Sequence, residues 1–327
     1  MENNKSIKGG REIMRLYAID ILRGIAAFGI VGCHLMLSPR TNAGSWVTHF
    51  CDMNVAVFAV LAGYFTYVHN EWGGGVWPTI KHRLVRLLPL YFFWSLVFLA
   101  ASFMFKTVAH DDMSQYRQTD FWLKVVFQGN ASCHLWFIIA LVYTQIAALF
   151  LMRWKLPVAL PLILAITGIA LSVALRNWYG TYFFRLFGFV WLGIALRTIA
   201  NGTWRFYTVW TAVALVLHVL LAGILHRFLR DLLVVVPLVL LAVQVSKAFP
   251  SVPSWVLSLA RTLGATSLGV YLIHPLVTRF NGCLIARLCP PPYGIPSVLL
   301  DWSLSWGCAF ILAWACLRLP YLRRLVQ

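Results

Sequence analysis

Acidic side chains are scarce in this sequence. Asp and Glu together number 10 in 327 residues, against 27 Lys and Arg, and 11% of the residues are charged whereas 61% are hydrophobic. Soluble domains carry about 25% charged residues, so a soluble globule and a disordered chain are excluded. A nucleic-acid-binding domain is excluded as well, because its positive charge would lie on a polar surface. An integral helical membrane protein remains.

Several other features are missing. The spacings CxxC and HExxH do not occur, so nothing in the sequence predicts a metal site. No internal repeat, low-complexity tract or soluble terminal domain is evident, which favours one integral membrane domain over residues 1–327 with a polar tail at 1–15. The seven cysteines are odd in number, and spacing alone leaves open a disulfide between Cys51 and Cys133.

Apolar runs separated by polar residues predict an all-α transmembrane bundle of about ten spans, each close to the roughly 20 residues that cross a bilayer. The predicted spans are 16–37, 54–69, 84–105, 134–152, 157–175, 182–200, 206–226, 231–248, 266–286 and 297–318. An even number of spans places both termini on one side. Sixteen basic residues fall on that side and ten on the other, which favours cytoplasmic termini because cytoplasmic loops are rich in Lys and Arg.

Ionisable side chains inside a span are energetically costly and are therefore candidates for function. The first span contains Asp20, Arg23 and His34. Asp20 and Arg23 are three residues apart, so they are neighbours on a helix and can pair. Arg23 and His34 are eleven residues apart, about three turns, and share one face at an axial separation of about 16 Å. An interfacial arginine and a packed core histidine are the structural alternative.

Arg83 and Arg86 are neighbours at the cytoplasmic entry of the third span. Two interpretations stay open: anchoring of the helix by positive charge on the inner side, and bidentate binding of phosphate, for which arginine is suited. Three glycines precede them at 73–75. No strand comes before these glycines and no Lys-Ser or Lys-Thr follows, so they are interpreted as a turn and not as a phosphate-binding loop.

Two further clusters carry histidine. His134 and Trp136 begin the fourth span, where tryptophan is typical of a membrane interface and a histidine can simply be solvated. Tyr271 and His274 share a face of the ninth span. Pro275 follows, and a proline inside a span leaves backbone groups that protein or cavity water must satisfy. A buried structural histidine is the alternative for His274.

Taken together, these residues resemble the acyltransferase-3 family of integral membrane O-acyltransferases, from residue 16 to about residue 280. The matching motifs are Arg23-Gly24 with His34, Arg83-x-x-Arg86 with Pro89, NVAVFAVLAGY at 54–64, His134-Leu-Trp136-Phe and SLGVYLIHP near the C-terminus. Chain length and the lack of an added extracellular domain are most similar to stand-alone bacterial O-acetyltransferases of surface glycans, including the enterobacterial common antigen subgroup.

The resemblance implies transfer of an acyl group, acetyl above all, from cytoplasmic acyl-CoA to a hydroxyl of a cell-envelope polysaccharide or lipid-linked glycan, in the bacterial inner membrane. His34 matches the family's essential histidine and Arg23 its partner on the same helix, and both are assigned as catalytic. Arg83 and Arg86 match the arginine pair assigned to the acyl-CoA donor. Acyl-CoA is a substrate, so no permanently bound cofactor is expected, and the oligomeric state is left open.

This chemistry suits the residue types. The phosphates of CoA are ligands for arginine, histidine is a base that works near neutral pH, and the developing charge on the thioester carbonyl needs donors such as Arg23, Tyr271 or His274. The expected supporting and acceptor-site residues are Asp20, His134, Trp136, Tyr271 and His274. One departure is Ala62 before Gly63, where the family usually has serine.

A secondary transporter or glycan exporter is the main alternative, since ten spans with buried histidine and arginine suit it equally. The lack of evident repeats counts against it, as does the scarcity of carboxylates in span cores, where Asp20 is taken as the only one. A purely structural or assembly subunit is the third hypothesis.

Overall fold

The computed structural model describes residues 16–35, 51, 53–71, 76–109, 112–132, 134–152, 157, 159–175, 181–199, 202–221, 224, 227–288 and 294–326. Within these ranges the chain is helical, with turns and short irregular segments but no strand, so the all-α prediction is confirmed for them. Cys51 is a free, buried thiol. The tail at 1–15, the glycines at 73–75 and Cys133 lie outside the described residues.

Each predicted span coincides with a helix. In chain order these are α1 (Tyr17–Cys33), α3 (Met53–Glu71), α4 (Val76–Ala109), α6 (Trp136–Met152), α7 (Ala159–Ala174), α8 (Thr181–Ile199), α9 (Trp204–Leu220), α10 (Arg227–Ala248), α11 (Ser254–Leu288) and α12 (Ile295–Arg318). The short elements are η2 (Ser114–Arg117) and α5 (Thr119–Gln128), between α4 and α6, and α13 (Pro320–Arg323) after α12. α4 and α11 are longer than predicted, at 34 and 35 residues, because basic residues end an apolar run without ending a helix.

Four segments of the described chain are long and apolar enough to cross a membrane. They are Ile80–Thr107, Leu229–Ala248, Ser254–Leu288 and Ile295–Arg318. Shorter apolar helices, among them α6, α7 and α9, accompany them. The outer faces are apolar too, as on α4, where Leu96 and Met104 are both 67% exposed. The chain is therefore a multi-pass membrane protein, while the number of ten spans and the cytoplasmic location of the termini stay predictions.

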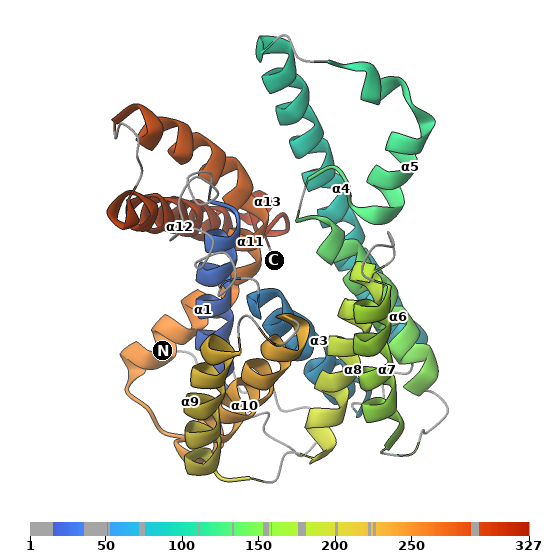
Figure 1. Ribbon diagram of the computed structural model, residues 1–327, viewed down its shortest axis with the longest axis vertical. Coiled ribbons are helices and arrows are strands. Elements are labelled where there is room, and N and C mark those ends of the chain that lie inside the picture. Colours follow the sequence, from blue (N-terminus) through green and yellow to red (C-terminus); the bar gives the residue numbers. More distant parts are fainter. Residues whose placement is uncertain are drawn as a thin grey trace.

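α1 and α3 lie in the middle of the bundle (Figure 1). α1 packs along α11 and also contacts α3, α10 and α12, whereas α3 packs along α8. The α3–α8 crossing is a backbone contact: a Cβ at Gly63 would lie 1.9 Å from the Val190 carbonyl oxygen, and one at Gly193 would lie 2.0 Å from that of Val60. Small residues permit this close approach between membrane helices.

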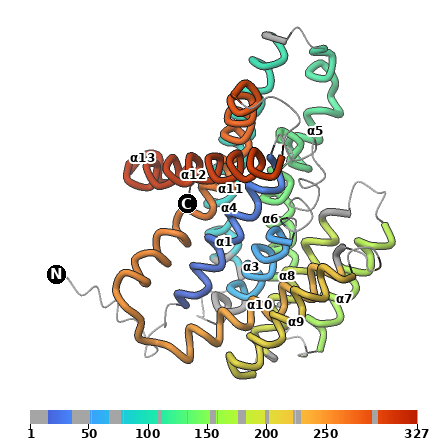
Figure 2. The backbone as a smooth tube through the Cα atoms, turned by 60° about the vertical axis from the view of Figure 1, so that its left-hand side comes forward, coloured from blue at the N-terminus to red at the C-terminus, as the bar shows by residue number. Residues whose placement is uncertain are grey.

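Both ends of α1 are fixed by distant helices. At its N-terminal end, the backbone N–H of Ala18 donates to the Ser246 hydroxyl of α10 over 3.0 Å. Toward its C-terminal end, the Trp302 indole of α12 donates to the Phe28 carbonyl over 2.9 Å and stacks on the Phe28 ring at 4.6 Å between centroids. Figure 2 shows α12 crossing that end of α1. The ionisable side chains that α1 carries therefore have defined positions.

Buried carboxylates are more numerous than the sequence predicts. Asp231 and Asp301 are at most 1% exposed, so the expectation that Asp20 is the only carboxylate in a span core is wrong. Oδ2 of Asp231 in α10 lies 3.1 Å from Nη2 of Arg185 in α8. Arg185 and Arg230, counted as charges on the outer side, are also buried. The pair with Asp231 allows Arg185 to be buried between the helices. A count of the charges between apolar runs does not detect such a pair.

Candidate active site

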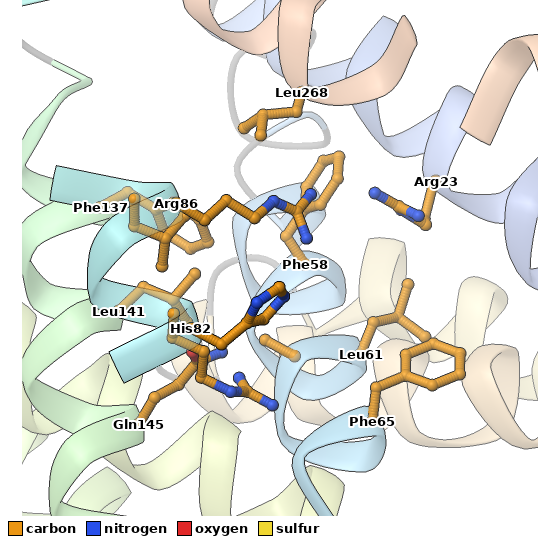
Figure 3. Close-up of a pocket in the computed structure, with 13 residues that line it drawn as sticks. Arg23, Phe58, Leu61, Phe65, His82, Arg86, Phe137, Leu141, Gln145 and Leu268 are labelled. Carbon is orange, nitrogen blue, oxygen red and sulfur yellow. The ribbon is translucent and has the colours of Figure 1, made fainter. Parts of the chain in front are cut away.

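A cavity of about 410 Å³ lies between α1, α3, α4 and α6 (Figure 3). Its basic side chains are Arg23 of α1 and His82, Arg83 and Arg86 of α4. Its other lining residues are Phe58, Leu61, Ala62, Phe65, Leu87, Phe137, Leu141, Gln145 and Leu268. No carboxylate occurs among these described lining residues, so the wall of the cavity is positively charged. The structure thus brings together the three arginines that the sequence assigns to function.

Arg23 is positioned by its own helix and by α11. Its Nη1 lies 3.9 Å from Oδ1 of Asp20, which confirms the expected pair one turn apart. Asp20 in turn packs against α11, since a Cβ at Gly264 would lie 2.4 Å from Asp20 Oδ1. Asp20 therefore supports Arg23, which lies about three turns before His34 on α1.

Arg83 and Arg86 lie one turn apart on α4 and both line the cavity. Figure 3 shows the guanidinium group of Arg86 directed across the cavity toward Arg23. Arg83 is half-buried, whereas Arg86 and His82 are exposed. The predicted span begins at residue 84 and leaves His82 outside it, but the structure places His82 in α4, because the helix begins at Val76. His82 is thus a cavity residue that sequence reasoning missed.

Three histidines from distant parts of the chain meet at the other end of α1. His34 follows the last residue of α1, His134 precedes α6, and His274 lies in α11. The ring centroid of His274 lies 5.1 Å from that of His34 and 5.4 Å from that of His134, and the His34 and His134 centroids lie 6.5 Å apart. His134 and His274 are buried, so the solvated interpretation of His134 is wrong. Among the described residues, no group of three or more His, Cys, Asp or Glu side chains is placed to hold a metal ion.

Hydrogen bonds orient this histidine cluster. The Tyr271 hydroxyl donates to the backbone carbonyl of His134 and ties α11 to the start of α6. Nδ1 of His134 lies 3.0 Å from the Ser132 hydroxyl, and Nδ1 of His274 lies 2.7 Å from the Tyr271 carbonyl oxygen. The Nε2 atoms of His134 and His274 are buried and have no hydrogen-bond partner in the described part of the chain. The cluster is thus held in place through the two Nδ1 atoms and the Tyr271 hydroxyl.

An aromatic wall connects the cavity with the cluster. Phe58 and Phe137 line the cavity, and their ring centroids lie 6.5 and 5.5 Å from that of Tyr271. The Tyr271 centroid lies 5.4 Å from that of His134 and 6.0 Å from that of His274. The arginines and the histidines therefore belong to one continuous region along α1.

The geometry separates the three residues that the sequence offers as donors to a developing oxyanion. Arg23 lies with the cavity, about 16 Å along α1 from the histidine end. The hydroxyl of Tyr271 is engaged with a backbone carbonyl, and His274 contacts a carbonyl of its own helix through Nδ1. Trp136 begins α6 beside the aromatic wall, with its ring 6.1 Å from that of Phe137.

Sequence reasoning also missed two polar residues of this region besides His82. Gln145 of α6 is buried in the cavity wall. An amide inside an apolar run is the signal that marks it, because polar groups within a span need internal partners. Ser132 contacts His134 across a turn, and nothing in the sequence distinguishes it from other loop serines.

A family model described as an acyltransferase domain matches residues 16–318, nearly the whole chain. The chain belongs to the acyltransferase-3 family. Neither a curated protein nor a solved structure matches it. The matched range includes the arginines of the cavity and all three histidines of the cluster, so the family membership expected from these motifs is confirmed. The general activity is therefore acyl transfer by a membrane protein.

Proposed function

We propose that this acyltransferase moves an acyl group, acetyl above all, from cytoplasmic acyl-CoA to a hydroxyl of a cell-envelope polysaccharide or lipid-linked glycan in a bacterial inner membrane. The observation that carries the proposal is the arrangement on α1, with an arginine cavity toward one end and a histidine cluster at the other. The anionic donor needs arginines and the hydroxyl acceptor needs a histidine base, and both must lie close enough to act on one thioester.

The arginine cavity suits the donor. CoA carries several phosphate charges, and guanidinium groups bind phosphate through paired, charge-assisted hydrogen bonds. Arg83 and Arg86 provide two such groups from one helix, and Arg23 provides a third from α1. The described lining residues include no carboxylate, and a wall of this charge suits a phosphate ligand. With the phosphates in the cavity, the thioester end of the donor extends past Phe58 and Phe137 toward the histidines.

The histidine cluster suits the transfer step. His34 takes the proton of the acceptor hydroxyl while the hydroxyl oxygen attacks the thioester carbonyl, the carbon–sulfur bond breaks, and the proton passes to the CoA thiolate. When the Ser132 hydroxyl donates to Nδ1 of His134, the ring proton of His134 resides on Nε2. That N–H then stabilises the oxyanion of the tetrahedral intermediate. Transient acylation of His34 is the other route that histidine chemistry allows.

The direct test is acyl-CoA-dependent acylation of glycan by membranes that contain the protein, followed by mass spectrometry of the glycan. His34→Ala should abolish the acyl mass while the amount of protein in the membrane stays constant, because the base is lost. His218→Gln is the matched control, since His218 is a buried histidine of α9 and is not part of the cluster. Full activity of His34→Ala would contradict the assignment.

The same measurement in a deletion strain separates the enzyme from the exporter. Loss of the acyl mass on an otherwise normal surface glycan supports the transferase. Loss of the surface glycan itself would indicate export. Membranes can also be incubated with labelled acyl-CoA and no acceptor. If the protein then carries the labelled acyl group and His34→Ala abolishes this labelling, His34 acts as the acyl carrier and not as the general base.

A further inference from the structure

Pro275 changes the hydrogen bonding of α11 at the histidine cluster. It lies inside the helix and has no backbone N–H. In a regular α-helix that N–H would donate to the carbonyl four residues earlier, which here belongs to Tyr271. The His274 ring occupies the position of the lost donor: its Nδ1 lies 2.7 Å from the Tyr271 carbonyl oxygen, closer than the 3.2 Å to the Val270 carbonyl oxygen.

This contact determines which nitrogen of His274 carries the proton. A carbonyl oxygen only accepts hydrogen bonds, so Nδ1 must be the N–H of the neutral ring and Nε2 must hold the lone pair. Nδ1 contacts the helix backbone, and Nε2 lies farther along the ring from it, buried and without a hydrogen-bond partner in the described residues. The rings of His34 and His134 lie 5.1 and 5.4 Å away between centroids.

We propose that Pro275 and His274 fix the tautomer of His34. Nε2 of His274 accepts a hydrogen bond from one ring N–H of His34, which leaves the other nitrogen of His34 unprotonated and ready to receive the proton of the acceptor hydroxyl. The structure does not contain this hydrogen bond, but the ring centroids lie 5.1 Å apart, so a turn of the His34 ring brings one of its nitrogens within hydrogen-bond reach of Nε2. His274 is a positioning residue that acts through His34. The inference rests on the proposed function, in which His34 is the base.

Glutamine and asparagine at position 274 test the roles of the two ring nitrogens one at a time. His274→Gln places an amide near the position of Nε2, where its oxygen still accepts. His274→Asn keeps an N–H near Nδ1 for the Tyr271 carbonyl but has no group near Nε2. We expect kcat of His274→Gln to stay within about tenfold of wild type and kcat of His274→Asn to fall about 100-fold or more, because a wrong tautomer removes the base. The KM for acyl-CoA stays unchanged in both, since the arginine cavity is intact.

Pro275→Ala tests the role of the missing backbone N–H. The new N–H at position 275 competes with His274 for the Tyr271 carbonyl, so kcat should fall about threefold to tenfold at unchanged KM for acyl-CoA. In the His274→Asn background the same change should have no further effect, because it acts only through the imidazole. Pro237→Ala in α10 is the matched control, since Pro237 is also internal to a helix and should leave kcat unchanged.

Titration with acyl-CoA shows which variants are folded. If His274→Asn does not bind acyl-CoA, the test rests on the other two variants: kcat should fall in Pro275→Ala and stay unchanged in Pro237→Ala. Wild-type activity of His274→Asn together with loss of activity in His274→Gln would show that His274 only satisfies the Tyr271 carbonyl, and would overturn the proposal. An unchanged kcat in Pro275→Ala would overturn it too. These failures leave the dependence on His34 in place, whereas an active His34→Ala refutes the proposed function itself.

Discussion

Two groups of arginines occupy this bundle in different ways. Arg23, Arg83 and Arg86 line a cavity without a carboxylate among its described lining residues. Arg185 and Arg230 are buried between α8, α9 and α10, where Arg185 pairs with Asp231 and Arg230 donates to the His218 carbonyl over 3.4 Å.

The difference lies in what compensates the charge. A charge inside a membrane protein must be paired, and in the buried group the Asp231 carboxylate and a backbone carbonyl fulfil that requirement. In the cavity, Nη1 of Arg23 lies 3.9 Å from the Asp20 carboxylate, and the described lining residues themselves include no carboxylate. The buried arginines are compensated within the helix packing, whereas the cavity arginines are the ones to which we assign an anionic ligand. The predictions below test this distinction, from the largest expected effect to the smallest.

Asp231→Ala should destabilise the protein most. It leaves Arg185 buried without its carboxylate, which costs about 3–5 kcal/mol. The midpoint of thermal unfolding in detergent should drop and the yield of folded protein should fall. Arg185→Met combined with Asp231→Leu should recover most of the loss, because replacing both partners by apolar groups removes the uncompensated charge. A normal unfolding midpoint in Asp231→Ala would show that the pair contributes nothing.

Arg83→Ala and Arg86→Ala should each weaken acyl-CoA binding without unfolding the protein. Loss of a charged hydrogen-bonding group costs about 1.5–3 kcal/mol, which corresponds to roughly a 10- to 100-fold rise in Kd. Titration of purified protein with acyl-CoA measures this. Arg205→Ala is the control, since Arg205 is exposed on α9 and stacks on Trp204 outside the cavity. An unaltered Kd in both variants would remove the donor site from the cavity.

Gly264→Ala should have an intermediate effect that concerns Arg23 alone. The new methyl group would meet Oδ1 of Asp20 at 2.4 Å, so the Asp20–Arg23 pair must shift. Overpacking of this kind costs about 1–3 kcal/mol, and part of it should appear as a weaker affinity for acyl-CoA. Gly307→Ala provides the control, since a Cβ there has nothing within 4 Å. Equal Kd values for acyl-CoA in Gly264→Ala and Gly307→Ala would show that Asp20 does not affect donor binding.

Asp120→Ala should change least. Asp120 pairs with Lys124 one turn later on α5 at 2.5 Å, but its side chain is 68% exposed. Exposed pairs of this kind contribute about 0.3–0.5 kcal/mol. Neither the unfolding midpoint nor the affinity for acyl-CoA should move measurably. A large destabilisation here would show that exposure does not distinguish the ion pairs of this protein.

Much of the fold follows from local sequence. The apolar runs locate the long helices of the described residues, and the spacing of Asp20 and Arg23 predicts their pair correctly. Local sequence is less informative where helix and membrane boundaries differ. The predicted third span begins at residue 84 and therefore leaves out His82, although α4 begins at Val76 and His82 lines the cavity.

The sequence by itself determined a basic membrane protein with arginine and histidine on one face of its first span, because composition and helical periodicity are properties of short segments. Only the tertiary structure decided which of the many charges are compensated. Arg185 and Asp231 are 46 residues apart, and Tyr271 is 137 residues from the His134 carbonyl that it contacts. Such contacts depend on how helices pack, and packing joined His34, His134 and His274 in one site.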